Sequence, residues 1–140
     1  MTVTILTVDD SRTMRDMLRM ALVDAGFRVV QAEDGLHGLD VLRGERPQVV
    51  ITDINMPRMD GFGFIEAVRQ DQAYRAVPIL VLTTESDDEK KTRARRAGAT
   101  GWIVKPFDPA KDRRLALNMY AVAVSPSDGM IWGTAIGYPG

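Results

Sequence analysis

The centre of this chain reads Val49-Val50-Ile51-Thr52-Asp53-Ile54-Asn55-Met56-Pro57-Arg58-Met59-Asp60-Gly61. A run of apolar, mostly β-branched residues stops at a carboxylate, and turn-forming residues follow at once. Such a run is typical of a strand that is buried on both faces in the middle of a parallel sheet. We therefore expect Asp53 at the carboxyl end of a central strand, where open α/β sheets place their ligand sites.

Size and composition exclude several classes of function. The chain has 140 residues, a formal net charge of −1 and no cysteine. This length predicts one domain, and the near-neutral charge predicts neither nucleic acid nor an anionic membrane as a partner. The lack of cysteine excludes disulfides, thiolate metal sites and thiol catalysis. The N-terminus lacks a signal-peptide pattern, and no apolar stretch approaches the ~20 residues of a membrane span, so we expect a cytoplasmic protein.

Strand and helix patterns alternate along the chain, which predicts repeated β-α units and a parallel sheet. Strands are expected at residues 3–8, 27–32, 49–52, 79–83 and 102–104. The first helix is expected to start at the N-cap Ser11 and to end at Gly26. The second should end near Gly44, and the fourth should start at a capping box, Ser86-Asp87-Asp88-Glu89, and end at Gly98.

Polar side chains lie where four of these strands end. They are Asp9 and Asp10 (first strand), Asp53 (third), Thr83 (fourth) and Lys105 (fifth). The carboxyl ends of parallel strands share one edge of the sheet, so three carboxylates should meet there and repel each other unless a cation joins them. Oxygen ligands suit Mg²⁺, while an ammonium and a hydroxyl suit a tetrahedral anion. This chemistry fits an aspartate that accepts a phosphoryl group.

Residues 3–110 resemble the receiver domain of two-component response regulators, most closely the stand-alone chemotaxis receivers of the CheY type. The matching motifs are Val8-Asp9-Asp10-Ser11-Arg12, Thr52-Asp53-Ile54-Asn55-Met56-Pro57, Met59-Asp60-Gly61, Leu82-Thr83-Thr84-Glu85, Gly98-Ala99 and Lys105-Pro106-Phe107. The resemblance implies a flavodoxin-like, doubly wound sheet of five parallel strands in the order 2-1-3-4-5, with five helices on its two faces.

The resemblance also implies a metal site. Asp53 would be the phosphoacceptor, and Mg²⁺ would be bound by Asp10, Asp53 and the backbone carbonyl of Asn55, with Asp9 assisting largely through water.

It further implies a switch. Thr83 and Lys105 would contact the phosphoryl oxygens, and Thr83 would move toward that group while Trp102 turns inward. From the residues alone, Trp102 either rotates between two packings or is fixed in the core. The resemblance makes the Lys105-Pro106 bond a candidate cis peptide.

The implied partners are a sensor histidine kinase upstream and a flagellar motor switch protein or another signalling protein downstream. We expect no enzymatic turnover beyond slow Mg²⁺-dependent self-phosphorylation and autodephosphorylation, and no DNA-binding module after residue 110. A phosphate shuttle without its own target is an alternative. A phosphohydrolase of the dehalogenase type is a weaker one, because its second aspartate is Asn55 here and an amide cannot transfer the proton.

The end of the chain departs from the family pattern. We expect the receiver domain to span residues 1–124, with an atypical fifth helix because residues 115–124 are apolar nearly all round. Residues 125–140 are expected to form an irregular tail rich in glycine, proline and aromatic residues. The tail either folds over its own fifth helix or over the partner-binding face, engages a second copy by swapping or by adding a strand at a sheet edge to form a homodimer, or is disordered.

Overall fold

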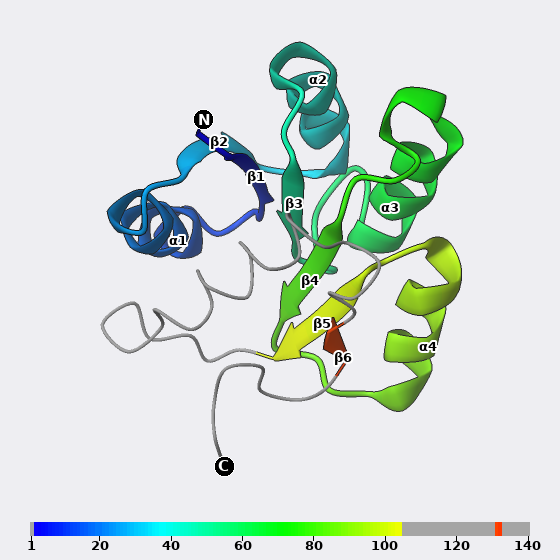
Figure 1. Ribbon diagram of the computed structural model, residues 1–140. Helices are drawn as coiled ribbons and strands as arrows, with labels where there is room; N and C mark the ends of the chain where they lie inside the picture. The colour runs from blue at the N-terminus through cyan, green and yellow to red at the C-terminus, as the bar shows by residue number, and fades with distance from the viewer. Residues whose placement is uncertain (1, 105–130, 133–140) are drawn as a thin grey trace.

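The computed structural model of this protein describes residues 2–104 and 131–132 (Figure 1). Lys105, the Lys105-Pro106 bond, the predicted fifth helix and most of the tail lie outside the described residues.

The described strands form one parallel sheet in the order β2-β1-β3-β4-β5-β6. Their bounds are β1 (Thr4–Val8), β2 (Arg28–Ala32), β3 (Val49–Thr52), β4 (Ile79–Thr83), β5 (Gly101–Val104) and β6 (Ile131–Trp132). The predicted flavodoxin-like order 2-1-3-4-5 is therefore confirmed. Phe27, placed in the second strand by its apolar character, lies just before β2 and is buried.

The sixth strand was not predicted as a regular element. β6 pairs in parallel with β5, with Ile131 opposite Gly101 and Trp132 opposite Trp102. Two residues of the tail thus extend the sheet of their own chain at the β5 edge. Strand addition was among the alternatives for the tail, but there it was assigned to a second copy.

Four α-helices and one 3₁₀ turn lie between the described strands. They are α1 (Arg12–Asp24), α2 (Gly35–Glu45), α3 (Gly61–Gln70), η1 (Gln72–Tyr74) and α4 (Asp88–Ala97). The N-cap Ser11 is confirmed, since its side chain accepts a hydrogen bond from the N–H of Met14 at 3.2 Å.

The start of α4 differs from its prediction, and the end of α2 agrees with it. The N-cap of α4 is Asp87 instead of Ser86, because the Asp87 carboxylate accepts the N–H of Glu89 at 2.8 Å. Helix α2 ends at Glu45, close to the expected Gly44, and its C-cap residue Arg46 adopts a left-handed conformation.

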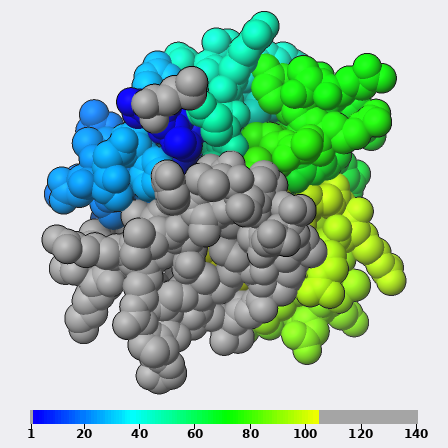
Figure 2. Space-filling view, in the orientation of Figure 1, coloured from blue at the N-terminus to red at the C-terminus, as the bar shows by residue number. Residues whose placement is uncertain are grey.

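The helices in the described part of the chain are divided unequally between the two faces of the sheet (Figure 1). Helix α1 packs Leu18 and Leu22 against one face, in a cluster that reaches Ile103 on β5. Helices α2, α3 and α4 cover the other face, and Figure 2 shows them following one another along one side of the molecule in cyan, green and yellow-green.

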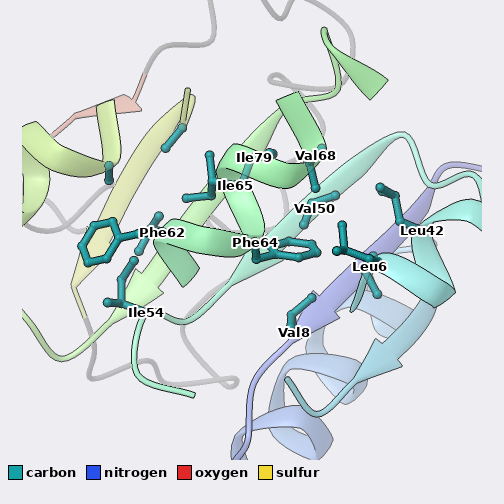
Figure 3. Close-up of a cluster of buried hydrophobic side chains, with 14 of the residues drawn as sticks. Leu6, Val8, Leu42, Val50, Ile54, Phe62, Phe64, Ile65, Val68 and Ile79 are labelled. Carbon is teal, nitrogen blue, oxygen red and sulfur yellow. The ribbon is translucent and has the colours of Figure 1, made fainter. Parts of the chain in front are cut away.

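The larger core lies under these three helices and directly behind the central strand. It surrounds Phe64 of α3, whose ring lies among Leu6, Leu42 and Val50 in Figure 3. The Phe64 side chain is fully buried. Packed strands and helices of this kind give the loops at the carboxyl edge of the sheet a rigid support.

Candidate functional site

Three carboxylates meet at the carboxyl edge of the sheet, as the sequence predicted. Val8 and Thr52 are opposite each other in the β1–β3 register, so Asp9 and Asp53 leave the sheet side by side. One oxygen each of Asp9, Asp10 and Asp53 lies within 4.8 Å of the other two. Asp9 is buried, Asp53 is half-buried and Asp10 is exposed, so the cluster opens to solvent on one side.

Local backbone contacts orient these carboxylates. Oδ1 of Asp53 accepts the N–H of Ile54 at 2.7 Å, and Oδ1 of Asp9 accepts the N–H of Ser11 at 2.9 Å. The N–H of Asp53 also donates to the carbonyl of Val8 at 2.9 Å, which continues the β1–β3 pairing up to the site. The carboxylates are therefore positioned by the strand ends and not by long, flexible connections.

The donor set fits Mg²⁺. Three carboxylates this close repel each other strongly unless a cation lies between them. Their ligand atoms are all oxygens, and an open side leaves room for water and a phosphoryl oxygen, both of which Mg²⁺ commonly retains in proteins. Asp9, Asp10 and Asp53 are the residues that would hold it.

The predicted constellation also includes Thr83 and Lys105. Thr83 is the last residue of β4, next to β3 in the sheet, and is fully buried. Its Oγ1 accepts the N–H of Glu85 at 3.3 Å. Thr83 therefore lies at the same edge as the carboxylates. Lys105 directly follows β5 and lies outside the described residues.

A polar link joins the loop after Asp53 to the loop after β4. The amide nitrogen Nδ2 of Asn55 donates to Oε1 of Glu85 at 3.2 Å, and Nζ of Lys90 lies 3.1 Å from the same oxygen. The pKa of the Glu85 carboxyl is lowered from 4.5, chiefly by the hydrogen bond from Lys90 and next by that from Asn55. Glu85 belongs to the motif Leu82-Thr83-Thr84-Glu85, but nothing in the sequence alone indicated a role for its side chain.

Changing Lys90 to methionine is expected to raise the pKa of Glu85 toward 4.5, because the largest cause of its lowering is then removed. Any stability from this pair is present above pH 4.5 and is lost as the pH falls through the lowered pKa. A carboxyl ¹³C NMR titration measures the change. The matched control is Lys91→Met, which should leave the pKa of Glu85 in place, and an unchanged value in Lys90→Met would contradict the prediction.

Trp102 lies in the core beside this link. Its side chain is fully buried, and its indole N–H donates to the backbone carbonyl of Glu85 at 3.1 Å. The structure therefore places Trp102 inward. Its predicted rotation between two packings stays a prediction.

No helix among the described residues has both the length and the apolar character needed to cross a membrane.

Known proteins are similar to this chain in sequence and in architecture. The sequence model of the response regulator receiver domain matches residues 5–115. The chemotaxis protein CheY-3 of Vibrio cholerae is 41% identical over 107 residues, which cover 76% of this chain and 82% of that protein. A chemotaxis protein CheY homolog of Campylobacter jejuni is 40% identical over 107 residues, which cover 75% and 82% of the two chains.

Solved structures agree with these relatives. The chemotaxis response regulator CheY4 of Vibrio cholerae matches with a TM-score of 0.78 and 42% identity, over 88% of this chain and 99% of that one. A response regulator protein from Burkholderia multivorans matches with a TM-score of 0.69 and 47% identity, over 90% and 98% of the two chains. With the sheet order and the carboxylates at its edge already matching, these similarities show that the chain belongs to the response regulator receiver domain family.

Proposed function

We propose that this chain is a chemotaxis-type response regulator in which Asp53 accepts a phosphoryl group from a sensor histidine kinase. The observation that carries the proposal is the cluster of Asp9, Asp10 and Asp53 at the carboxyl edge of the sheet, with ligand atoms within 4.8 Å of one another. The chemotaxis names of its relatives support the choice of signalling system.

In the proposed transfer, a carboxylate oxygen of Asp53 attacks the phosphorus of a phosphohistidine. The new P–O bond forms as the P–N bond breaks, and the released imidazole nitrogen takes up a proton. A bound Mg²⁺ supplies charge neutralisation for the carboxylates and the incoming phosphoryl oxygens. Asp9, Asp10 and Asp53, with the backbone carbonyl of Asn55, would hold the ion, and Thr83 and Lys105 would contact the phosphoryl oxygens.

The residue two positions after Asp53 favours a long-lived aspartyl phosphate over its rapid hydrolysis. A general acid/base at this place would speed hydrolysis of the aspartyl phosphate, but Asn55 has an amide that cannot transfer a proton. Its amide nitrogen already donates to Glu85. This arrangement supports a phosphorylated form that persists, and it argues against the phosphohydrolase alternative.

Output would use direct protein contact, to a flagellar motor switch protein or another signalling protein. Thr83 and Trp102 are connected through one residue, because Thr83 accepts the N–H of Glu85 and Trp102 donates to its carbonyl. Movement of Thr83 toward a phosphoryl group would therefore disturb the hydrogen bond that holds Trp102. A shift of a few kcal/mol between two such states is enough to change a partner's affinity strongly.

The proposed function is tested by incubating the protein with a small phosphodonor such as acetyl phosphate, with Mg²⁺ or with excess EDTA. We expect one alkali-labile phosphoryl group per chain, mapped to Asp53 by mass spectrometry. Removing the metal should abolish its formation, because the repulsion among the carboxylates and the donor is then unrelieved. Labelling at another residue, or equal labelling in EDTA, would contradict the proposal.

A further inference from the structure

The loop between β3 and α3 contains a strained residue. Arg58 has a φ of 64°, a left-handed conformation that L side chains rarely adopt. Arg46 is the other such non-glycine residue in the part of the chain that the structure describes, and its place at the end of α2 explains its conformation. Arg58 ends no helix, and it lies five positions after the phosphoacceptor. Strain of this kind persists where the surrounding contacts hold it.

The contact that holds Arg58 is an ion pair with Asp34. Nε and Nη2 of Arg58 lie 2.8 and 2.7 Å from Oδ2 of Asp34. The other oxygen, Oδ1, accepts the N–H of His37 at 2.9 Å as the N-cap of α2. Asp34 is only 3% exposed, so it is a fixed acceptor and not a mobile surface acid. The hydrogen bond from the His37 N–H, with a further contribution from Arg58, keeps the pKa of Asp34 below its ordinary 3.8.

A second contact joins the same two segments. The N–H of Gly35 donates to the carbonyl of Met59 at 3.1 Å. A Cβ at Gly35 would lie 2.7 Å from that carbonyl oxygen and 2.6 Å from Cγ of Met59, so the two backbones meet with no room for a side chain. The start of α2 therefore supports the loop at two consecutive residues, Arg58 and Met59.

The loop is also fixed at its other end. The N–H of Gly61 donates to the carbonyl of Ile54 at 2.8 Å, and Asn55 is linked to Glu85. The loop is thus held between α2 on one side and the β4–α4 connection on the other. It begins at Ile54, whose N–H binds the Asp53 carboxylate, and it includes the Asn55 carbonyl that would face the metal.

We propose that Arg58 and Asp34 are positioning residues for the phosphoacceptor site, acting through the loop that follows Asp53. The expected effect on phosphorylation rests on the proposed function, whereas the contacts of Arg58 and Asp34 are independent of it. Neither residue belongs to the carboxylate cluster. Loss of their ion pair releases the loop at Arg58, so the Asn55 carbonyl and the Ile54 N–H are less well placed for Mg²⁺ and for Asp53.

The test compares Arg58→Gly with Arg46→Gly. Both variants remove an exposed arginine and relieve a left-handed residue, which favours the folded state. In Arg58→Gly this gain is offset by the loss of the ion pair with the buried Asp34, so its midpoint of thermal unfolding should lie below that of Arg46→Gly. We expect Arg58→Gly to raise the Mg²⁺ concentration at half-saturation, measured by calorimetric titration, roughly tenfold, near the low end of what loss of an outer-shell partner costs a metal site. Phosphorylation at subsaturating Mg²⁺ should slow to a similar degree. Arg46→Gly should change neither quantity.

Two further variants separate positioning from general stability. Asp34→Asn keeps the side-chain acceptor for His37 but removes the charge, so it should reproduce the effect of Arg58→Gly, and the double variant should add little. Arg58→Lys keeps the charge and the strained backbone, and it should rescue part of the loss. Amide hydrogen exchange at Gly35 should be faster in Arg58→Gly than in wild type.

These readouts distinguish the two proposals. Unchanged Mg²⁺ half-saturation and unchanged exchange at Gly35 in Arg58→Gly, or equal changes in Arg46→Gly, would overturn the positioning inference. Failure of the wild-type protein to take up phosphate would instead refute the proposed function, while the Mg²⁺ titration and the exchange measurement would still judge the role of Arg58 and Asp34.

Discussion

Replacing Asp53 with asparagine is expected to abolish phosphorylation by a small donor or a histidine kinase. The amide nitrogen is not nucleophilic and the amide oxygen carries no charge, so no P–O bond forms at this position. Phosphate incorporation, measured with a radiolabelled donor or by intact mass, should fall from about one group per chain to an undetectable level. Alkali treatment should release the label from the wild type.

The same change separates chemistry from folding. Asp53 contributes one of three clustered carboxylates, so its neutralisation removes repulsion, and the thermal midpoint without Mg²⁺ should stay level or rise. Asp40→Asn, an exposed carboxylate on α2, is the matched control and should be phosphorylated like wild type. Phosphate on Asp53→Asn in the same amount would show that another residue is the acceptor.

Among the substitutions considered, Phe64→Ala is expected to lower the free energy of unfolding the most. The ring is fully buried in the core behind β3 (Figure 3), and such truncations cost about 3–5 kcal/mol because a cavity remains. A Cβ built on Gly38 would lie only 2.8 Å from Cε1 of Phe64, so the ring packs directly against this glycine. Gly38 has no side chain that could fill the cavity left in Phe64→Ala. Urea denaturation measures the change in unfolding free energy, and the thermal midpoint should fall by roughly 10–15 °C.

The control is Met20→Ala, which truncates a large apolar side chain in α1. Met20 is 67% exposed, so its removal should change the unfolding free energy by less than about 0.5 kcal/mol. Helix propensity favours alanine in both variants, and it therefore does not account for the difference. If Phe64→Ala lowered the unfolding free energy by less than about 1 kcal/mol, the result would contradict the packing of this side chain.

The contacts around Asp53 show where prediction from sequence ends. Asp9, Asp10 and Asp53 were found because each follows a strand, and the strand-end rule needs only local pattern. Glu85 and Asn55 are 30 residues apart, and Arg58 and Asp34 are 24 apart. No periodicity links such pairs. The signals available were indirect: Asp34 precedes a helix as N-cap residues do, and Arg58 lies in a turn-forming stretch.

Local sequence patterns also left the exact capping residues of two helices undecided. Ser86 and Asp87 are both good N-cap residues, and in the structure it is the Asp87 carboxylate that caps α4. At the end of α2, expected near Gly44, the left-handed C-cap residue is Arg46. Local propensity indicates where a helix ends to within a few residues, while the surrounding packing selects the residue.

The sequence by itself determined the strands, their parallel arrangement and the acidic cluster, because apolar runs, helical spacing and strand ends are short-range features whose geometry the backbone dictates. The strand order 2-1-3-4-5 was implied by the resemblance to receiver domains and not by these patterns. Only the tertiary structure decided the β6 pairing at the β5 edge, the inward place of Trp102 and the ion pair that joins Arg58 to α2. These contacts join segments far apart along the chain. They depend on how packed elements meet in space, which no local pattern records.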